Sequence, residues 1–359
     1  MWRSGVGMLA CVVLAAALVG SAPAARDASR AVARARALDA YSAMQRYFYS
    51  SADRSYAGTY PSRGHAQAWP FSQALWATIG VSSLTDVVED LRDRLQGLSA
   101  YSHPEPGRPA EFAPVYGGSG RVYYDDNLWI ALALVQTGGT APLATARRLF
   151  TLVGDGWDRD GSHPCPGGVF WTRLGANHDR NAVTTANAAL LALALYRRSG
   201  STAYLTWAQR AYDWTRRCLG TSSGLVADHI DLAGHVDGHT WSYNQGAMIA
   251  AGVRLYRATG ERRYLADAEK TAEAAEAKIG DPLASGEPPV FLAIFYRDLE
   301  ELTAEMPGRA DRASVEQFAD EAWARARDPK TGLFHFSGRG PTLLDQAAMV
   351  QIYAQLAEG

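Results

Sequence analysis

The sequence predicts an all-α protein in which six helical hairpins close into a toroid, an (α/α)6 barrel. An internal repeat is the first observation that predicts this fold. Three segments begin at Asn127, Asn187 and Asn244, and each contains an apolar helix of small residues, a glycine and a charged amphipathic helix. The glycines recur about 60 residues apart, which suits long hairpins with large loops better than short solenoid repeats.

The alternation of two helix types is the second observation. Helices that are apolar nearly all round belong inside a protein, whereas helices with one apolar stripe belong outside. In each repeat the first helix is of the inner type and the second is of the outer type. The third observation is that no run alternates apolar and polar residues with the period of two typical of a strand. An open superhelical array is the alternative arrangement of the same hairpins.

Flanking segments supply the remaining helices. They are predicted at residues 27–49, 68–76 and 84–98 before the repeats, and at residues 288–302, 310–326 and 341–356 after them. The arginines of the first segment form a solvated helix face, and Pro70 suits the first turn of the second segment. Because no Pro/Ser-rich linker divides the chain, we expect residues 25–359 to form one domain.

Residues 1–24 are predicted to be a secretory signal peptide. Arg3 supplies a positive start, residues 8–19 an apolar stretch, and Ala22-Pro23-Ala24 a small-residue cleavage site. The apolar stretch is short for a membrane span. We therefore expect a secreted protein, extracellular or in the cell envelope, without stable membrane insertion after cleavage. An uncleaved anchor is the alternative.

Charge and cysteine content limit the classes of partner. The net charge is −2 and no polybasic block is present, so nucleic-acid binding has no electrostatic footprint. Cys165 and Cys218 remain after cleavage and could pair in an oxidising compartment, although nothing in the sequence requires the bond. No Cys or His spacing is typical of a zinc site. We expect no metal and no cofactor.

The loops indicate which end of the barrel carries the function. Connections that precede inner helices are long and rich in Gly, Trp, His, Asn and Asp, whereas the turns from inner to outer helices are short. The long connections cover residues 114–124, 155–181, 222–243 and 281–287. Because all inner helices start at the same end of such a barrel, we expect the functional site at that end.

Asp125 and Asp126 stand at the start of an inner helix, among tyrosines and Trp129. One interpretation is helix capping, in which acidic side chains satisfy free N–H groups and the helix dipole. The other is chemistry with two carboxyl groups about 5 Å apart, the separation found in retaining glycosidases. Two carboxylates at that distance raise the pKa of one of them, which keeps an acid available near neutral pH.

A magnesium site for diphosphates is a third interpretation of the acid pair. Such a site requires another acid one helical turn further on, but the residue four positions after Asp125 is Trp129. The chain also contains no phosphate-binding Gly-Lys-Ser/Thr loop. These absences favour sugars over diphosphates.

Four motifs together resemble glycoside hydrolase family 76, the endo-α-1,6-mannanase family of secreted (α/α)6-barrel proteins. They are YYDDNLW at residues 123–129, GGVFW at 167–171, NAVTTAN at 181–187 and WSYNQG at 241–246. The resemblance extends from about residue 27 to the C-terminus. It implies a retaining mechanism with Asp125 as nucleophile and Asp126 as acid/base. Phe170 departs from the family, where a second tryptophan is expected, and this puts one stacking contact in doubt.

The predicted sugar-binding residues are aromatic or polar side chains at inner-helix starts or in the loops before them. They are Tyr124, Asn127, Trp129, Trp171, Asn181, Asp228, Trp241, Tyr243, Asn244 and Gln245. Rings would stack on sugar faces, and amides would donate to and accept from vicinal hydroxyls. Core packing is the alternative role for the rings, capping for the amides, and a solvated loop position for Asp228.

These features together predict a secreted, monomeric, retaining endoglycosidase that cleaves α-1,6-mannosidic linkages in mannan polysaccharides or oligosaccharides. Two alternatives remain open. A transglycosylase would pass the same covalent intermediate to a sugar acceptor of the cell wall. A non-catalytic glycan-binding toroid would bind the sugar without cleaving it, but such a protein does not need the intact acid pair that this chain has.

Overall fold

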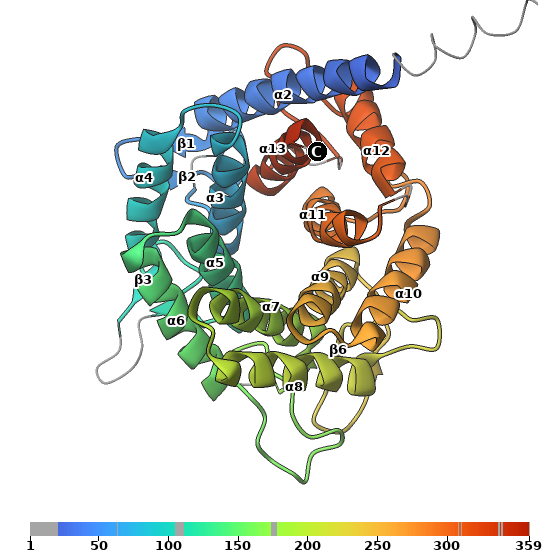
Figure 1. Cartoon of the computed structure of the whole chain (residues 1–359). Helices are drawn as coiled ribbons and strands as arrows, with labels where there is room; N and C mark the ends of the chain where they lie inside the picture. The colour runs from blue at the N-terminus through green and yellow to red at the C-terminus, as the bar shows by residue number, and fades with distance from the viewer. Residues whose placement is uncertain are drawn as a thin grey trace, which may run out of the picture.

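A computed structural model describes residues 21–358 except 63, 105–110, 174–177, 308, 310, 337 and 339. The described residues form twelve α-helices in two concentric rings (Figure 1). The predicted signal peptide lies almost wholly outside the described residues, since the first described helix begins at Ser21. Within the described part of the chain, no helix is long and apolar enough to cross a bilayer.

Six helices form the inner ring. They are α3 (Ala68–Ser82), α5 (Tyr124–Thr137), α7 (Ala182–Ser199), α9 (Ser242–Thr259), α11 (Pro289–Glu305) and α13 (Leu343–Glu358). Each contacts the next, and α13 contacts α3, so the ring is closed (Figure 1). The (α/α)6 barrel is thereby confirmed, and the open superhelical array is wrong.

Six further helices form the outer ring. They are α2 (Ser21–Phe48), α4 (Val88–Gly97), α6 (Thr140–Asp155), α8 (Thr202–Leu219), α10 (Arg262–Ile279) and α12 (Asp311–Arg325). From α3 onward each outer helix packs on the inner helix before it, whereas α2 packs on α13. The first described helix and the last therefore form the sixth inner–outer pair.

Composition explains which helix lies inside. In α7 every residue from Ala182 to Leu193 is buried, because this helix is apolar or small on all sides. In α8, by contrast, the buried residues form one stripe that includes Ala208, Ala211 and Leu219. Small residues also let the inner and outer helices approach each other closely. A Cβ added at Gly252 of α9 would lie 2.8 Å from the carbonyl oxygen of Tyr264 in α10.

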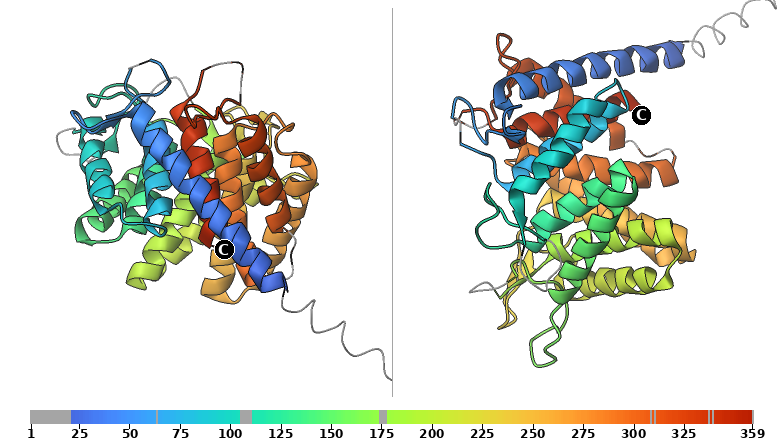
Figure 2. Two further views of the ribbon diagram at one scale, coloured as in Figure 1. Left: turned by 90° about the horizontal axis from the view of Figure 1, so that it is seen from above. Right: turned by 90° about the vertical axis from the view of Figure 1, so that its left-hand side faces the viewer.

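A glycine follows the last residue of α7 and of α9, as the repeat predicts. Gly200 and Gly260 adopt the left-handed conformation, with φ of 69° and 75°, which glycine tolerates without a steric penalty. The long connections lie at the opposite end, and the side views show them gathered there (Figure 2). All inner helices start at this end, which we call the loop end.

Short strands and one disulfide organise the loop end. The strands are β1 (Tyr49–Ser50), β2 (Ser55–Tyr56), β3 (Ser102–His103), β4 (Glu111–Phe112), β5 (Arg180–Asn181), β6 (His229–Ile230) and β7 (Val236–Asp237). They pair as β1–β2, β3–β4 and the antiparallel sheet β5–β6–β7. A disulfide joins Cys165 in the loop after α6 to Cys218 in α8. The sequence left this pairing open.

Two predicted helix ends differ from the structure. The helix predicted at residues 84–98 begins at Val88 and continues as a 3₁₀ turn, Leu98–Tyr101. In α5 the N-cap residue is Tyr123, which makes no side-chain capping bond. Asp125 and Asp126 are instead the second and third residues of the helix. An N-cap role for either acid is therefore wrong.

Candidate active site

The acid pair, Asp125 and Asp126, lies in the first turn of α5 at the loop end. The incoming loop at residues 169–173 runs antiparallel to the start of this helix. Its pairing is shown by the N–H of Tyr124, which donates to the carbonyl oxygen of Trp171 at 2.9 Å, and by a bridge between Tyr123 and Thr172. This pairing brings the indole of Trp171 beside the acids.

Trp171 makes the one direct side-chain bond to the acid pair that the structure describes. Its indole Nε1 donates to Oδ2 of Asp125 at 3.0 Å. Oδ1 of the same carboxyl group is buried and has no hydrogen-bond partner in the described structure. A buried oxygen without a partner is unfavourable unless a ligand or water supplies one. Oδ2 of Asp125 is thus fixed by Trp171, whereas Oδ1 remains available for a ligand.

Burial raises the pKa of both carboxyl groups. Burial raises the pKa of Asp125 to about 6, while the bond from Trp171 opposes this rise. The pKa of Asp126 lies well above its usual value, because the group is buried and because the negative charge of Asp125 is nearby. The negative charge of Asp125 therefore favours the protonated form of Asp126.

A second polar cluster faces the acid pair, and it contains Asp228, His229 and Asp179. His229 Nδ1 lies 2.9 Å from Oδ2 of Asp228, and its Nε2 lies 3.7 Å from Oδ2 of Asp179. The bond to Asp228 is the main reason that the pKa of His229 is raised. The amide of Asn244 donates to the other oxygen of Asp228 at 3.1 Å. Two neighbouring side chains therefore hold the Asp228 carboxyl group in a fixed orientation.

Both groups line a cavity of about 610 Å³ at the loop end. The lining combines aromatic rings, including Trp69, Trp129, Trp171 and Phe291, with polar side chains. Phe291, from the first turn of α11, lies 4.1 Å from the ring centroid of Tyr243. A concave site with aromatic walls and a few convergent polar groups suits a sugar, whose faces are apolar and whose rim carries hydroxyls.

Seven of the predicted site residues line this cavity. They are Asp125, Asp126, Trp129, Trp171, Asn181, Asp228 and Tyr243. Asn181 is the N-cap residue of α7, yet its side chain makes no capping bond and its Oδ1 is buried without a partner. That oxygen, like Oδ1 of Asp125, is an acceptor that a ligand hydroxyl could satisfy.

Three other predicted residues stand behind or beside the lining. Tyr124 is buried, and its ring would be only 2.6 Å from a Cβ added at Gly156, so it packs in the wall. Asn244 is buried and supports Asp228. Trp241 stacks on His239 with ring centroids 5.4 Å apart, and it contacts Phe291 edge-on.

Asn127 and Gln245 bond backbone groups in the barrel wall. Each is the fourth residue of its helix and clamps one residue of the preceding loop. Asn127 accepts from the N–H of Phe112 at 2.8 Å and donates to its carbonyl oxygen at 2.9 Å. Gln245 makes the same two bonds to Val226, both at 2.9 Å. A sugar would have to displace these bonds, so the geometry gives both amides a structural role.

Truncation of this clamp is expected to lower stability and to leave chemistry intact. Asn127→Ala should reduce the free energy of unfolding by about 3 kcal/mol, because backbone groups of Phe112 lose their buried partners. Urea denaturation would measure the loss. The KM of the folded variant should equal that of the wild type. A raised KM with unchanged stability would instead indicate contact with substrate.

Several cavity residues were not predicted as site residues. They include Trp69, Asp179, His229 and Phe291. Asp179 carried a usable signal, because it stands two positions before Asn181 and side chains alternate along an extended segment. Trp69 and Phe291 begin inner helices, and only the closed ring brings them to the same mouth as α5.

A closed double ring of helices, with an acid pair in an aromatic cavity at the loop end, defines an (α/α)6-barrel protein with the site features of a glycoside hydrolase. The sequence agrees with this class. The chain belongs to glycosyl hydrolase family 76, whose pattern matches residues 31–333. The predicted family is thereby confirmed.

Individual relatives cover different parts of the chain. A stretch of 143 residues is 31% identical to the mannan endo-1,6-alpha-mannosidase DCW1 of Candida albicans, covering 37% of this chain and 31% of that protein. The chain thus matches less than a third of this relative's length. A family 76 mannosidase of Bacteroides thetaiotaomicron has the same fold, with a TM-score of 0.80, 24% identity, and coverage of 90% of this chain and 98% of that one.

A third relative is an α-1,6-mannanase of a Salegentibacter species, in an inactive variant bound to α-1,6-mannotriose. In that variant two adjacent aspartates are replaced by asparagine. The TM-score is 0.73 at 20% identity, over 91% of this chain and 99% of that one. At this identity the likeness establishes a common fold.

Proposed function

We propose that this chain is a retaining glycoside hydrolase that cleaves α-1,6-mannosidic linkages within mannan chains. One observation carries the proposal: two neighbouring carboxyl groups share a cavity, burial raises the pKa of both, and the charge of Asp125 raises that of Asp126 further. A retaining glycosidase needs one ionised carboxylate and one protonated carboxylic acid at neutral pH. The acid pair supplies both.

The reaction would proceed in two steps. Asp125 attacks the anomeric carbon while Asp126 donates its proton to the departing glycosidic oxygen, which gives a mannosyl-enzyme and a shortened chain. Asp126, now ionised, then takes a proton from water, and this water cleaves the ester to Asp125. The bond from Trp171 holds the Asp125 carboxyl group and favours its ionised form.

The remaining cavity residues suit recognition of the sugar. Asp228 has both of its oxygens oriented by neighbours and is close enough to Asp125 to affect its pKa, so it would accept bonds from sugar hydroxyls near the reacting carbon. Asn181 offers an unpartnered carbonyl oxygen. Tyr243 and Trp171 provide ring faces at the cavity wall.

The choice of α-1,6-mannan rests on the relatives. The Candida protein carries the name of a mannan endo-1,6-alpha-mannosidase, and the Salegentibacter enzyme is an α-1,6-mannanase bound to an α-1,6-linked mannose trisaccharide. We further propose that residues 25–359 form one secreted, monomeric domain. An extracellular site of action agrees with the disulfide, since such bonds persist in oxidising compartments.

A digest of linear α-1,6-mannan tests the proposal. Products sized over time should pass through intermediate oligosaccharides, as internal cleavage requires, and proton NMR should show that the new reducing ends are first released as the α-anomer. Release of mannose alone from the start would indicate exo action. A β-anomer would exclude a retaining mechanism. Binding of the mannan without any cleavage would favour the glycan-binding toroid.

Transglycosylation uses the same acid pair and differs only in the acceptor. The same digest, repeated with α-mannose oligosaccharides added in excess, separates the two reactions. Products longer than the added oligosaccharides would show transfer from the mannosyl-enzyme to a sugar. Hydrolysis predicts that the product sizes stay unchanged.

The pH dependence of kcat/KM should be bell-shaped. Because Asp125 must be ionised, activity should rise with pH through about 6, and it should fall at higher pH where Asp126 loses its proton. Trp171→Phe removes a bond that lowers the pKa of Asp125, so the acid limb should move to higher pH. An acid limb below pH 4.5 in the wild type would contradict this assignment.

A further inference from the structure

Arg180 is a fully buried arginine in the wall of the cavity. It lies in β5 between Asp179 and Asn181, both of which line the cavity. Because side chains alternate along an extended segment, Arg180 points to the opposite side of the wall. A buried guanidinium is costly unless it is paired, so the bonds of its two terminal nitrogens identify what it is placed to hold, while its Nε has no partner in the described structure.

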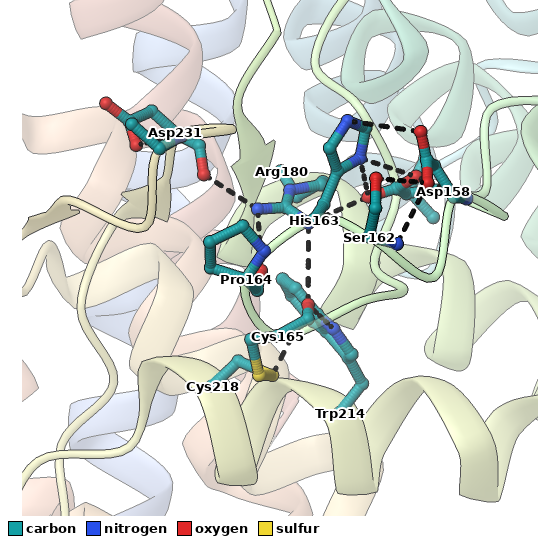
Figure 3. Close-up of polar contacts among 12 residues, drawn as sticks. Asp158, Ser162, His163, Pro164, Cys165, Arg180, Trp214, Cys218 and Asp231 are labelled. Carbon is teal, nitrogen blue, oxygen red and sulfur yellow. Dashed lines mark hydrogen bonds and ion pairs between the residues drawn. A yellow bond between two sulfur atoms is a disulfide. The ribbon is translucent and has the colours of Figure 1, made fainter.

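The guanidinium group binds two different loops (Figure 3). Nη1 donates to Oδ2 of Asp158 at 2.7 Å, and Nη2 donates to the carbonyl oxygen of Pro164 at 3.2 Å. Both acceptors belong to the loop after α6. Nη2 also donates to the carbonyl oxygen of Asp231 at 2.7 Å. Asp231 lies in the β6–β7 hairpin, the hairpin that carries the cavity residues Asp228 and His229.

The loop after α6 is anchored on the outer helix α8. The disulfide between Cys165 and Cys218 fixes it there, and the indole of Trp214 donates to the carbonyl oxygen of Cys165 at 3.1 Å (Figure 3). Directly afterwards the loop passes over Trp214 at Gly168, where an added Cβ would come within 2.5 Å of the indole ring. The loop is therefore held rigidly a few residues before it reaches the cavity.

From this anchor the backbone leads to the acid pair. The N–H of Trp171 donates to the carbonyl oxygen of Asp179 at 3.2 Å, and the Trp171 indole donates to Asp125. On the other side, the N–H of Ala182 donates to the carbonyl oxygen of Asp228 at 2.8 Å. The residues adjoining Arg180 in sequence thus contact both the segment that holds Asp125 and the segment that carries Asp228.

We propose that Arg180 is a positioning residue for the reaction. By binding the disulfide-anchored loop and the β6–β7 hairpin together, it fixes Trp171 and Asp228 on the two sides of the acid pair. The proposal rests on the glycosidase function proposed above. It assigns the disulfide a role in catalysis through Arg180, beyond its effect on stability.

The test uses Arg180→Lys, which keeps the charge and loses the fork of donors, and Asp158→Asn, a milder change that leaves the carbonyl bonds in place. Arg254→Lys is the matched control, because Arg254 also pairs with a carboxylate, Glu301, but lies far along α9 from its start at the loop end. On α-1,6-mannan we expect kcat to fall by about 10–100-fold in Arg180→Lys, since a displacement of about 1 Å costs this much. Asp158→Asn should show a smaller loss and Arg254→Lys none.

Two readouts separate positioning from general destabilisation. In Arg180→Lys and in Asp158→Asn the acid limb of the pH profile of kcat/KM should move to higher pH, because Trp171 no longer donates well to Asp125. Amide hydrogen exchange should quicken at residues 169–173, 178–182 and 228–231, and should stay unchanged in the inner helices far from the loop end. If both variants fold and keep the wild-type kcat and acid limb, Arg180 has no positioning role.

A double-mutant cycle tests the link to the disulfide. The Cys165→Ser/Cys218→Ser variant should also lose activity, and Arg180→Lys in that background should cost less than it costs in the wild type. Full additivity of the two losses would overturn the link. If the wild type cleaves no α-1,6-mannan, the proposed function fails, while the exchange pattern still decides whether Arg180 joins the two loops.

Discussion

Replacement of Asp125 with asparagine is expected to lower kcat/KM on α-1,6-mannan by about 10⁴-fold or more. The amide has the size of the carboxyl group and still offers an oxygen to the indole of Trp171, so the local structure should persist. It cannot form the covalent ester with the sugar. Loss of the negative charge should also lower the pKa of Asp126, because that charge helps to raise it. Initial rates of mannan cleavage measure the effect.

Asp345→Asn is the matched control for this loss. Asp345 is the third residue of the inner helix α13, as Asp126 is in α5, and burial raises its pKa as well. It lines a different cavity, between α11, α12 and α13. Its replacement should leave kcat/KM within about twofold of the wild type, since surface and remote changes have small effects. Equal losses in the two variants would mean that burial of any first-turn acid matters, and that Asp125 is not the nucleophile.

The fold could be predicted from the sequence because its main determinant is periodic. Glycines such as Gly200 and Gly260 end successive inner helices, and the two helix types differ in how apolar they are around the axis. These signals are local and repeat along the chain. The two-residue strands gave no such signal, because pairing between residues like Asn181 and His229 depends on a fold that brings distant loops together.

The acid pair predicted from one motif lies in the cavity lining, whereas some other predicted residues have a place that the repeat itself explains. Asn127 and Gln245 look like sugar-binding amides in isolation, but each is the fourth residue of an inner helix and clamps the preceding loop. Gln346, the fourth residue of α13, accepts from the N–H of Phe334 in the same way. An amide that recurs at the fourth position of several inner helices, here α5, α9 and α13, is therefore a sign of a structural role.

Contacts made by tertiary packing alone could not be predicted. The bond from Trp171 to Asp125 joins residues 46 positions apart, and the contacts of Arg180 extend to Asp231, 51 positions away. Nothing in the intervening sequence indicates either distance. The protonation of the acid pair likewise depends on burial by other helices, which a single motif cannot reveal.

Replacement of Asp126 with alanine is expected to separate the two steps of the reaction. Cleavage of mannan should fall by about 10²–10⁴-fold, because the departing sugar oxygen no longer receives a proton. A 2,4-dinitrophenyl α-mannobioside needs no such proton, since its leaving group is stable as an anion. On this substrate the first step should remain fast, and the mannosyl-enzyme should accumulate as a burst of dinitrophenol, because no base is left to activate water.

Addition of azide to the same variant tests the stereochemical course of the reaction. A small anionic nucleophile needs no general base, so azide should restore turnover of the activated substrate, and the product should be the α-mannobiosyl azide. That product requires two inversions at the anomeric carbon and therefore a covalent intermediate on Asp125. A β-mannobiosyl azide would show that azide replaces water in a single displacement, as in an inverting enzyme. If azide does not restore turnover in Asp126→Ala, and if the burst of dinitrophenol is absent as well, Asp126 is not the acid/base residue.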